Sequence, residues 1–159
     1  MKNIFNAVEA EEVIGRIEKL TVTSLPKWGS MSVSKMLAHC CVTYEMVYTD
    51  KYPRPNRLTR LILRKFIKNS VVSEKAYPKN GKTATAFIIK KDPVFDTEKA
   101  RLIAFIKQTQ ASGAAAFEGR NSHSFGRLTA KEWNVFFKTD NGITKNKIKL
   151  KKTKYCLYT

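Results

Sequence analysis

The sequence has few of the residues that build disulfide-held or metal-held folds. It contains three cysteines in 159 residues: Cys40 and Cys41 are adjacent, Cys156 lies near the end, and there is no Cys-x-x-Cys pair. This pattern does not fit a disulfide scaffold, a zinc ribbon or a thioredoxin-type motif. The apolar runs are far shorter than a membrane span, and the first residues lack the apolar region and cleavage site of a signal peptide. We therefore expect a cytoplasmic protein without a transmembrane segment.

Histidine and glycine are also scarce. His39 and His123 are the only histidines, and no serine or cysteine is spaced from them in a way that predicts a nucleophile triad. Gly113 and Gly119 fit neither the P-loop nor the dinucleotide-binding pattern. The sequence therefore gives no motif for phosphate-loop or triad chemistry.

Positive charge, in contrast, is abundant. Lys and Arg number 30 against 13 Asp and Glu, so the formal net charge is +17. Such an excess favours acidic partners, namely nucleic acid, anionic lipid or phosphorylated ligands. Heavy lysine use in an AT-rich genome explains the same composition equally well.

Hydrophobic spacing predicts an all-α fold. Helical periodicity covers residues 6–20 and 31–49, and further helices are predicted at 57–68, from a cap at Asp96 or Thr97, and after a capping box at Thr129–Glu132. Residues 70–94 read as an irregular crossover that covers other elements, with a short extended piece at 86–89. This order suggests an up-and-down four-helix bundle over residues 1–138, followed by a lysine-rich tail over residues 139–159. Lysine alternates with other residues over 145–151, which fits either a short strand or an unstructured tail.

The predicted helix at 57–68 carries both basic and apolar residues. At regular helical spacing, the four basic residues Arg57, Arg60, Arg64 and Lys68 share one line. The segment can lie on an anionic membrane or follow a phosphate backbone. More often such a line is the solvated face of a helix whose apolar side packs into the core, and this interpretation is the one we favour here.

His39 lies at the edge of the apolar face of the predicted helix 31–49. A histidine there is most often half-buried and bonded to a neighbour. It can also point into a cleft between helices. We name a candidate small-ligand pocket around it, formed by Trp28, Met36, Thr43 and Tyr44.

Three stretches resemble the DinB-like superfamily, and in particular a bacterial subfamily described only as a domain of unknown function. They are the WGSMSVSKMLAH stretch at 28–39, the helix containing KARLIAF at 99–105, and the NSHSFGRLTAKEW stretch at 121–133. The resemblance covers about residues 6–138. It implies a bundle with a three-histidine site for a divalent metal of the zinc or nickel type, as in thiol-dependent S-transferases. His39 matches the ligand on the second helix.

The sequence departs from this family at the other two ligands. The family pattern places a His-x-x-x-His pair on the last helix, whereas no histidine follows Trp133 here. His123 precedes that helix, and no spacing supports Asp140 or Cys156 as a replacement. We therefore expect no metal cofactor in this chain and no metal catalysis. A last helix that ends early exposes part of the core, which makes a homodimer plausible.

One hypothesis for the tail is a shifted reading frame. Asn141–Thr144 can be encoded AAT-GGC-ATC-ACT, and a shifted frame of that stretch contains TGG-CAT-CAC, which encodes Trp-His-His. Besides the small-ligand pocket near His39, two functional interpretations remain open. One is a DinB-like protein with a degenerate transferase site, and the other is a basic module that binds nucleic acid or anionic surfaces.

Overall fold

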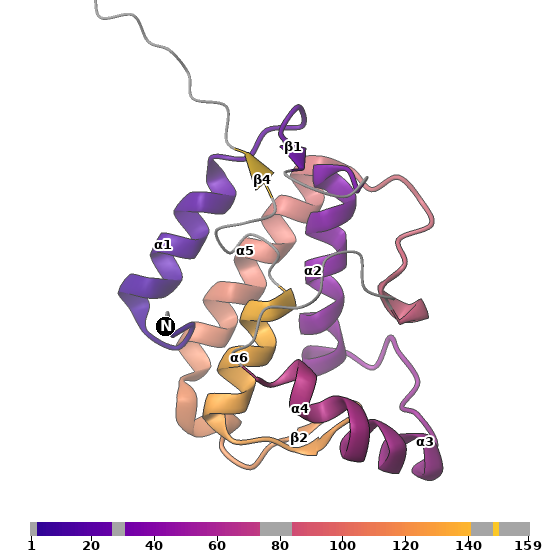
Figure 1. The fold of residues 1–159 in the computed structure, drawn as a ribbon. Helices are drawn as coiled ribbons and strands as arrows, with labels where there is room; N and C mark the ends of the chain where they lie inside the picture. The colour runs from indigo at the N-terminus through magenta and orange to yellow at the C-terminus, as the bar shows by residue number, and fades with distance from the viewer. Residues whose placement is uncertain (1–2, 27–30, 74–83, 141–147, 150–159) are drawn as a thin grey trace, which may run out of the picture.

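The computed structural model describes residues 3–26, 31–73, 84–140 and 148–149. The structure is mostly helical, as predicted, with little sheet. Four longer helices lie side by side: α1 (Ala7–Glu18), α2 (Val33–Tyr48), α5 (Phe95–Ser112) and α6 (Ala130–Asp140) (Figure 1). Within the described residues, no helix combines the length and the apolar character that a membrane crossing requires.

The contacts between helix ends fix the helix directions. The ammonium group of Lys99, near the start of α5, donates to the carbonyl oxygens of Glu18 and Leu20 at the end of α1. The Tyr48 hydroxyl at the end of α2 lies 2.8 Å from that of Thr109 near the end of α5. Helix α5 is therefore antiparallel to α1 and parallel to α2. Consecutive long helices of an up-and-down bundle are antiparallel, so the predicted up-and-down order is wrong between α2 and α5. A parallel pair needs a long connection, which residues 49–94 supply.

Side chains cap the starts of three of the four longer helices. Asn6 Oδ1 accepts from the Glu9 amide at 3.2 Å, and Ser32 Oγ accepts from the Lys35 amide at 3.3 Å. Thr129 and Glu132 form the complete reciprocal capping box. The cap of α5 is not where we predicted it, because the helix begins at Phe95 and so includes both Asp96 and Thr97 in its first turn. Asp96 and Glu98 still place negative charge near the positive end of the helix dipole.

Helix α2 is the centre of the core. Residues from every side of its middle turns are buried, including Ala38, Cys40, Cys41, Val42 and Thr43. The sequence predicted one buried stripe, but a helix covered by neighbours on several sides is buried nearly all round. The aromatic side chains Phe117, Trp133, Phe136 and Phe137 close the core from α6 and from the 3-10 turn η3 (Ala114–Phe117).

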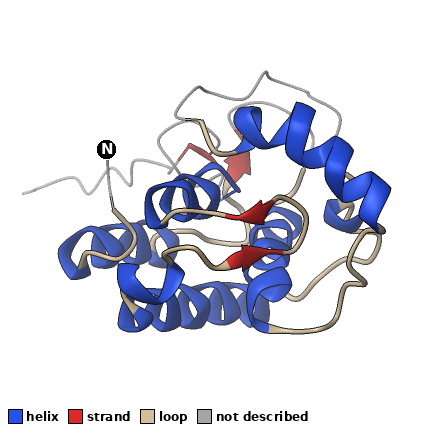
Figure 2. Cartoon of the chain, turned by 90° about the horizontal axis from the view of Figure 1, so that it is seen from below, coloured by secondary structure: helices blue, strands red, loops and turns tan. Residues whose placement is uncertain are grey.

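The connection after α2 carries a second helical segment. It contains α3 (Arg57–Ile62), a π-helical turn η1 (Leu63–Ile67) and α4 (Lys68–Val71), which form one continuous segment (Figures 1 and 2). Helix α3 is its far end, away from the four longer helices, and α4 lies beside α6. Further along, Thr85–Phe87 forms a 3-10 turn, η2, where we predicted an extended piece at 86–89.

Two short antiparallel strand pairs complete the structure. Strand β2 (Asn121–Ser122) pairs with β3 (Gly126–Arg127), and Gly126 adopts the left-handed φ of +74° that this tight turn needs. Strand β1 (Leu25–Pro26) pairs with β4 (Ile148–Lys149), so this part of the lysine-rich tail is a strand, one of the two predicted alternatives. Residues 141–147 and 150–159 lie outside the described part of the chain.

Candidate functional site

His39 is half-buried on α2 and is bonded to a neighbouring group, as its position predicts. Its Nδ1 lies 3.0 Å from the carbonyl oxygen of Phe87 in η2, and the two rings are 5.2 Å apart. A carbonyl oxygen only accepts, so Nδ1 carries the proton and donates it. The lone pair of the neutral ring is then on Nε2. The bond ties the crossover to the central helix.

The metal that the family resemblance implies does not fit the described donors. A carbonyl bonded to the second ring nitrogen is typical of a histidine that binds metal. A catalytic zinc site, however, takes three protein ligands. No group of three His, Cys, Asp or Glu residues that could hold an ion occurs within residues 3–26, 31–73, 84–140 and 148–149.

The predicted pocket residues are part of the packed interior. Met36 is 5% exposed, and Thr43 and Tyr44 are completely buried. The Tyr44 ring stacks on Phe137 at 4.9 Å and on Phe105 at 5.6 Å. Trp28 lies outside the described residues. The structure thus brings three of the four residues into the core, and a ligand cavity beside them stays a prediction.

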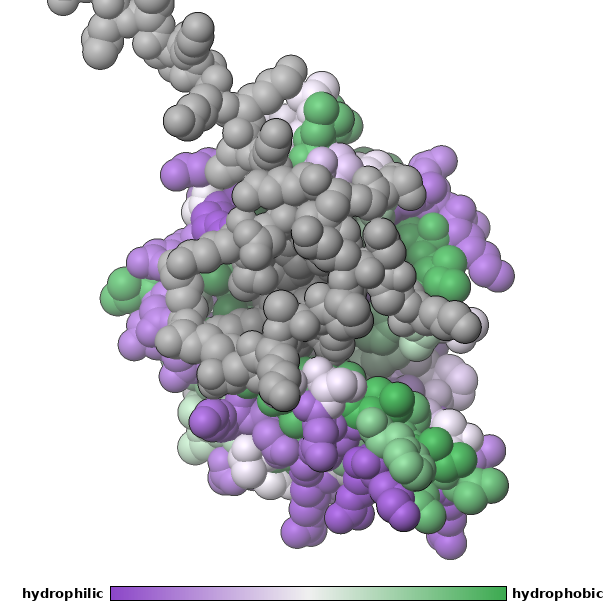
Figure 3. Space-filling view, viewed as in Figure 1, coloured by the Kyte–Doolittle hydropathy of each residue, from purple (hydrophilic) through white to green (hydrophobic). Residues whose placement is uncertain are grey.

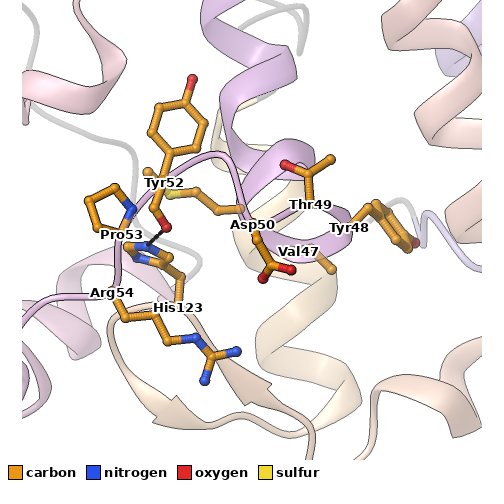
Figure 4. A pocket seen from close by; sticks show the side chains of 9 residues that line it. Val47, Tyr48, Thr49, Asp50, Tyr52, Pro53, Arg54 and His123 are labelled. Carbon is orange, nitrogen blue, oxygen red and sulfur yellow. Dashed lines mark hydrogen bonds between the residues drawn. The ribbon is translucent and has the colours of Figure 1, made fainter.

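The hollow shown in Figure 4 lies at the other end of α2. Its volume is about 360 Å³, and it is lined by Met46–Thr49, by Asp50 and residues 52–54, and by His123 from the β2–β3 turn. His123 Nδ1 lies 2.8 Å from the Ser124 hydroxyl, and Nε2 lies 3.3 Å from the Tyr52 carbonyl oxygen. Both ring nitrogens are therefore occupied. His123 links the hairpin to the loop after α2, which is a structural task.

An ionic cluster around the buried Glu45 joins α2 to α5, and our sequence analysis missed it. The Glu45 side chain is only 6% exposed. Its Oε1 accepts from the Lys51 ammonium at 2.8 Å and from the Arg101 guanidinium, and its Oε2 accepts from the Tyr52 hydroxyl at 2.9 Å. Arg101 also bonds both oxygens of Glu98 at 2.8 Å. The sequence did contain a signal for this cluster. Glu45 lies one helical turn after Cys41 and therefore on the same face of the helix, and a carboxylate on a buried face needs bonding partners.

The surroundings of this cluster shift several pKa values. Burial alone raises the pKa of Glu45, but hydrogen bonds from Lys51 and Tyr52 and the charges of Lys51 and Arg101 outweigh it and lower the pKa below its ordinary value. Burial and the bond to Glu45 raise the pKa of Tyr52. Burial, then the charge of Glu98, raises the pKa of Cys41, which is therefore an inert thiol. With a donor on each oxygen, Glu45 is a stabilising anion and is not placed to act as a general base.

Another candidate site is the segment α3–η1–α4. Its orientation differs from the one that we favoured from the sequence. We expected its apolar side to pack into the core. Instead Leu58 is 69% exposed, Leu61 60%, Ile62 49% and Phe66 67%, and no residue of α3 or η1 is fully buried. Only Leu63, Val71 and Val72 pack against the core, and each is partly buried.

The basic residues of this segment divide into two groups. Arg57 and Arg64 are exposed and Arg60 is half-exposed, and none of the three forms an ion pair with a carboxylate of the described residues. Lys68 instead pairs with Glu132 of α6 at 2.8 Å. The π turn explains this difference from the predicted line, because the Lys68 amide bonds the Leu63 carbonyl five residues back. That register sets Lys68 above Leu63, on the side that faces the protein.

We call the exposed residues of this segment the basic–apolar face. It consists of Arg57, Leu58, Arg60, Leu61, Ile62, Arg64, Lys65 and Phe66. Figure 3 shows it at the lower right of the molecule, where an apolar patch borders strongly hydrophilic side chains. Residues 51–73 contain seven Lys or Arg and no Asp or Glu. Within the described residues, the surface therefore combines arginines that pair with no carboxylate and apolar groups exposed to water.

Comparisons with family models, with curated proteins and with solved structures gave no match. The DinB-like resemblance accordingly stays a prediction.

Proposed function

We propose that this protein is a binding module that attaches to polyanionic surfaces through the basic–apolar face. The observation that carries the proposal is that Arg57, Arg60 and Arg64 project from one exposed helical segment without a carboxylate partner in the described residues. Unpaired guanidinium groups keep their full field, which attracts phosphate and sulfate groups. The net charge of +17 adds a long-range attraction of the same sign.

We further propose a DinB-like bundle as the scaffold. Its support is the order and direction of α1, α2, α5 and α6 and the long connection between the parallel pair α2 and α5. On this proposal His39 occupies the position of a metal ligand in the DinB-like family. The chain would then use the scaffold of a family of metal-dependent enzymes as a binding module.

The proposal is tested by the salt concentration that elutes the protein from a heparin column. The variant Arg57→Gln/Arg60→Gln/Arg64→Gln removes three charges from the basic–apolar face. The matched variant Lys19→Gln/Lys91→Gln/Lys107→Gln removes three from exposed positions elsewhere. We expect the first to elute at clearly lower salt than the second, because clustered charges act together on one polyanion. Equal elution of the two variants shows that only net charge matters and overturns the proposal.

A further inference from the structure

The basic–apolar face has one property that attraction to polyanions does not explain. Three large apolar side chains, Leu58, Leu61 and Phe66, are each at least 60% exposed beside its arginines. Isolated apolar residues on a surface are ordinary, but a contiguous apolar patch marks an interaction site. We infer that the polyanionic surface is an anionic lipid bilayer and that these side chains enter the boundary between headgroups and acyl chains. This inference rests on the proposed function.

The segment is anchored so that the face stays free. Lys68 bonds Glu132 at 2.8 Å, and Leu63 and Val71 pack against the core. At the other end, Asn56 Oδ1 accepts from the Thr59 amide at 2.8 Å and caps α3. The segment is therefore a preformed helix held along one side, and binding does not require it to fold first.

The side chains are arranged as in helices that lie in a membrane surface. Such helices have an apolar side bordered by Lys and Arg. Here helical spacing puts Arg57, Arg60 and Arg64 on one line beside the apolar side chains. Lys65 rises from among the apolar residues, and its ammonium lies 5.6 Å from the centre of the Phe66 ring. Long basic side chains in that position extend to the headgroups while their stems stay in the apolar layer.

The chemistry favours a bilayer over the other acidic partners. Nucleic acid would neutralise the arginines but leave Leu58, Leu61 and Phe66 in water, since phosphates bury no apolar side chain. A bilayer with anionic headgroups satisfies both groups at once. The complete absence of Asp and Glu from residues 51–73 suits an anionic surface, because each carboxylate there would be repelled by it.

The test measures binding of the full chain to vesicles of phosphatidylcholine alone and of phosphatidylcholine with phosphatidylserine. The variant Leu61→Ser/Phe66→Ser removes apolar groups and keeps every charge. The matched variant Val22→Ser/Ile88→Ser removes exposed apolar groups elsewhere, at 67% and 52% exposure. We expect binding only to the anionic vesicles, and a loss of about tenfold or more in the first variant from its lost apolar transfer. The second variant should bind as the unaltered protein does.

Each other outcome overturns the inference in a recognisable way. Unchanged vesicle binding by Leu61→Ser/Phe66→Ser means that attraction is purely electrostatic. If the protein binds heparin through the clustered arginines but does not bind vesicles, the proposed function stands and the inference of a bilayer is rejected. If the unaltered protein binds neither heparin through the clustered charges nor anionic vesicles, both proposals are rejected. A dimer in sedimentation that Leu61→Ser/Phe66→Ser makes monomeric assigns the face to a second copy of the chain.

Discussion

The Glu45 carboxylate gathers three donors at one buried point. Lys51 and Tyr52 come from the loop after α2, and Arg101 comes from α5. Paired in this way, a buried charge is stable, but its partners depend on it. The cluster therefore holds the first residues of the loop after α2 to both α2 and α5.

We expect Glu45→Gln to lower the free energy of unfolding by about 1–3 kcal/mol, because the amide keeps the bond from Tyr52 but loses the ionic bonds. Chemical denaturation measures this loss. Glu11→Gln, at an exposed position on α1, is the control and should change stability by less than about 0.5 kcal/mol. Equal effects of the two substitutions would mean that the cluster does not stabilise the fold.

The lowered pKa of Glu45 also sets a dependence on pH. In the unfolded chain this group titrates near 4.5, and in the folded protein it titrates lower. Its contribution is therefore present above about pH 4.5 and is lost as the pH falls through the folded pKa. Glu132, whose pKa is lowered despite burial by its bonds to Lys68 and Thr129, acts in the same direction. Thermal melting from pH 7 to pH 3 should fall more steeply for the unaltered protein than for Glu45→Gln, and parallel curves would contradict this.

Among the elements, the segment α3–η1–α4 separates what sequence predicts from what it does not. Its helical character follows from spacing, whereas the Asn56 cap was found only in the structure. Its orientation does not, because its apolar residues Leu58, Leu61 and Ile62 can equally be read as the inward side. Only the π turn and the position of α6 decide that Leu63 faces the protein. Long-range contacts of this kind leave no local signature.

A pair of substitutions tests that orientation. Leu63→Ala removes a side chain that packs against the core and should cost about 1–2 kcal/mol of stability, since it is only partly buried. Leu61→Ala removes the same group from an exposed position and should cost less than about 0.5 kcal/mol. Urea denaturation distinguishes the two. A larger loss at Leu61 than at Leu63 would show that the segment is turned the other way.

The helices around α2 were the easiest part of the structure to predict. Their caps and apolar spacing are local, and the half-buried position of His39 follows from the same periodicity. Its partner, the Phe87 carbonyl, comes from a turn 48 residues away and could not be found from spacing. The ionic cluster was missed for the same reason, because Arg101 reaches Glu45 from another helix.

At the scale of the whole molecule, the described residues form a helical scaffold. They contain no group of three His, Cys, Asp or Glu side chains that could hold a metal ion. We expect purified, tag-free protein to contain transition metal well below one equivalent in elemental analysis. His39→Ala should leave that value unchanged. Near-stoichiometric metal that disappears in His39→Ala would show that residues outside the described ranges complete a site, and transferase assays would follow.

The central claim concerns the basic–apolar face in two conditions. In the free protein no other part of the chain covers it, and in the membrane-bound protein an anionic bilayer covers it. Labelling of Ile62→Cys, on the same face at 49% exposure, with a thiol reagent in a chain that also carries Cys156→Ser tests it most directly. Cys40 and Cys41 are buried and serve as slow internal references. The account predicts that Cys at this position reacts about as fast as a free thiol in buffer and much more slowly with vesicles containing phosphatidylserine. Slow reaction in buffer alone, or no protection by those vesicles, would contradict it.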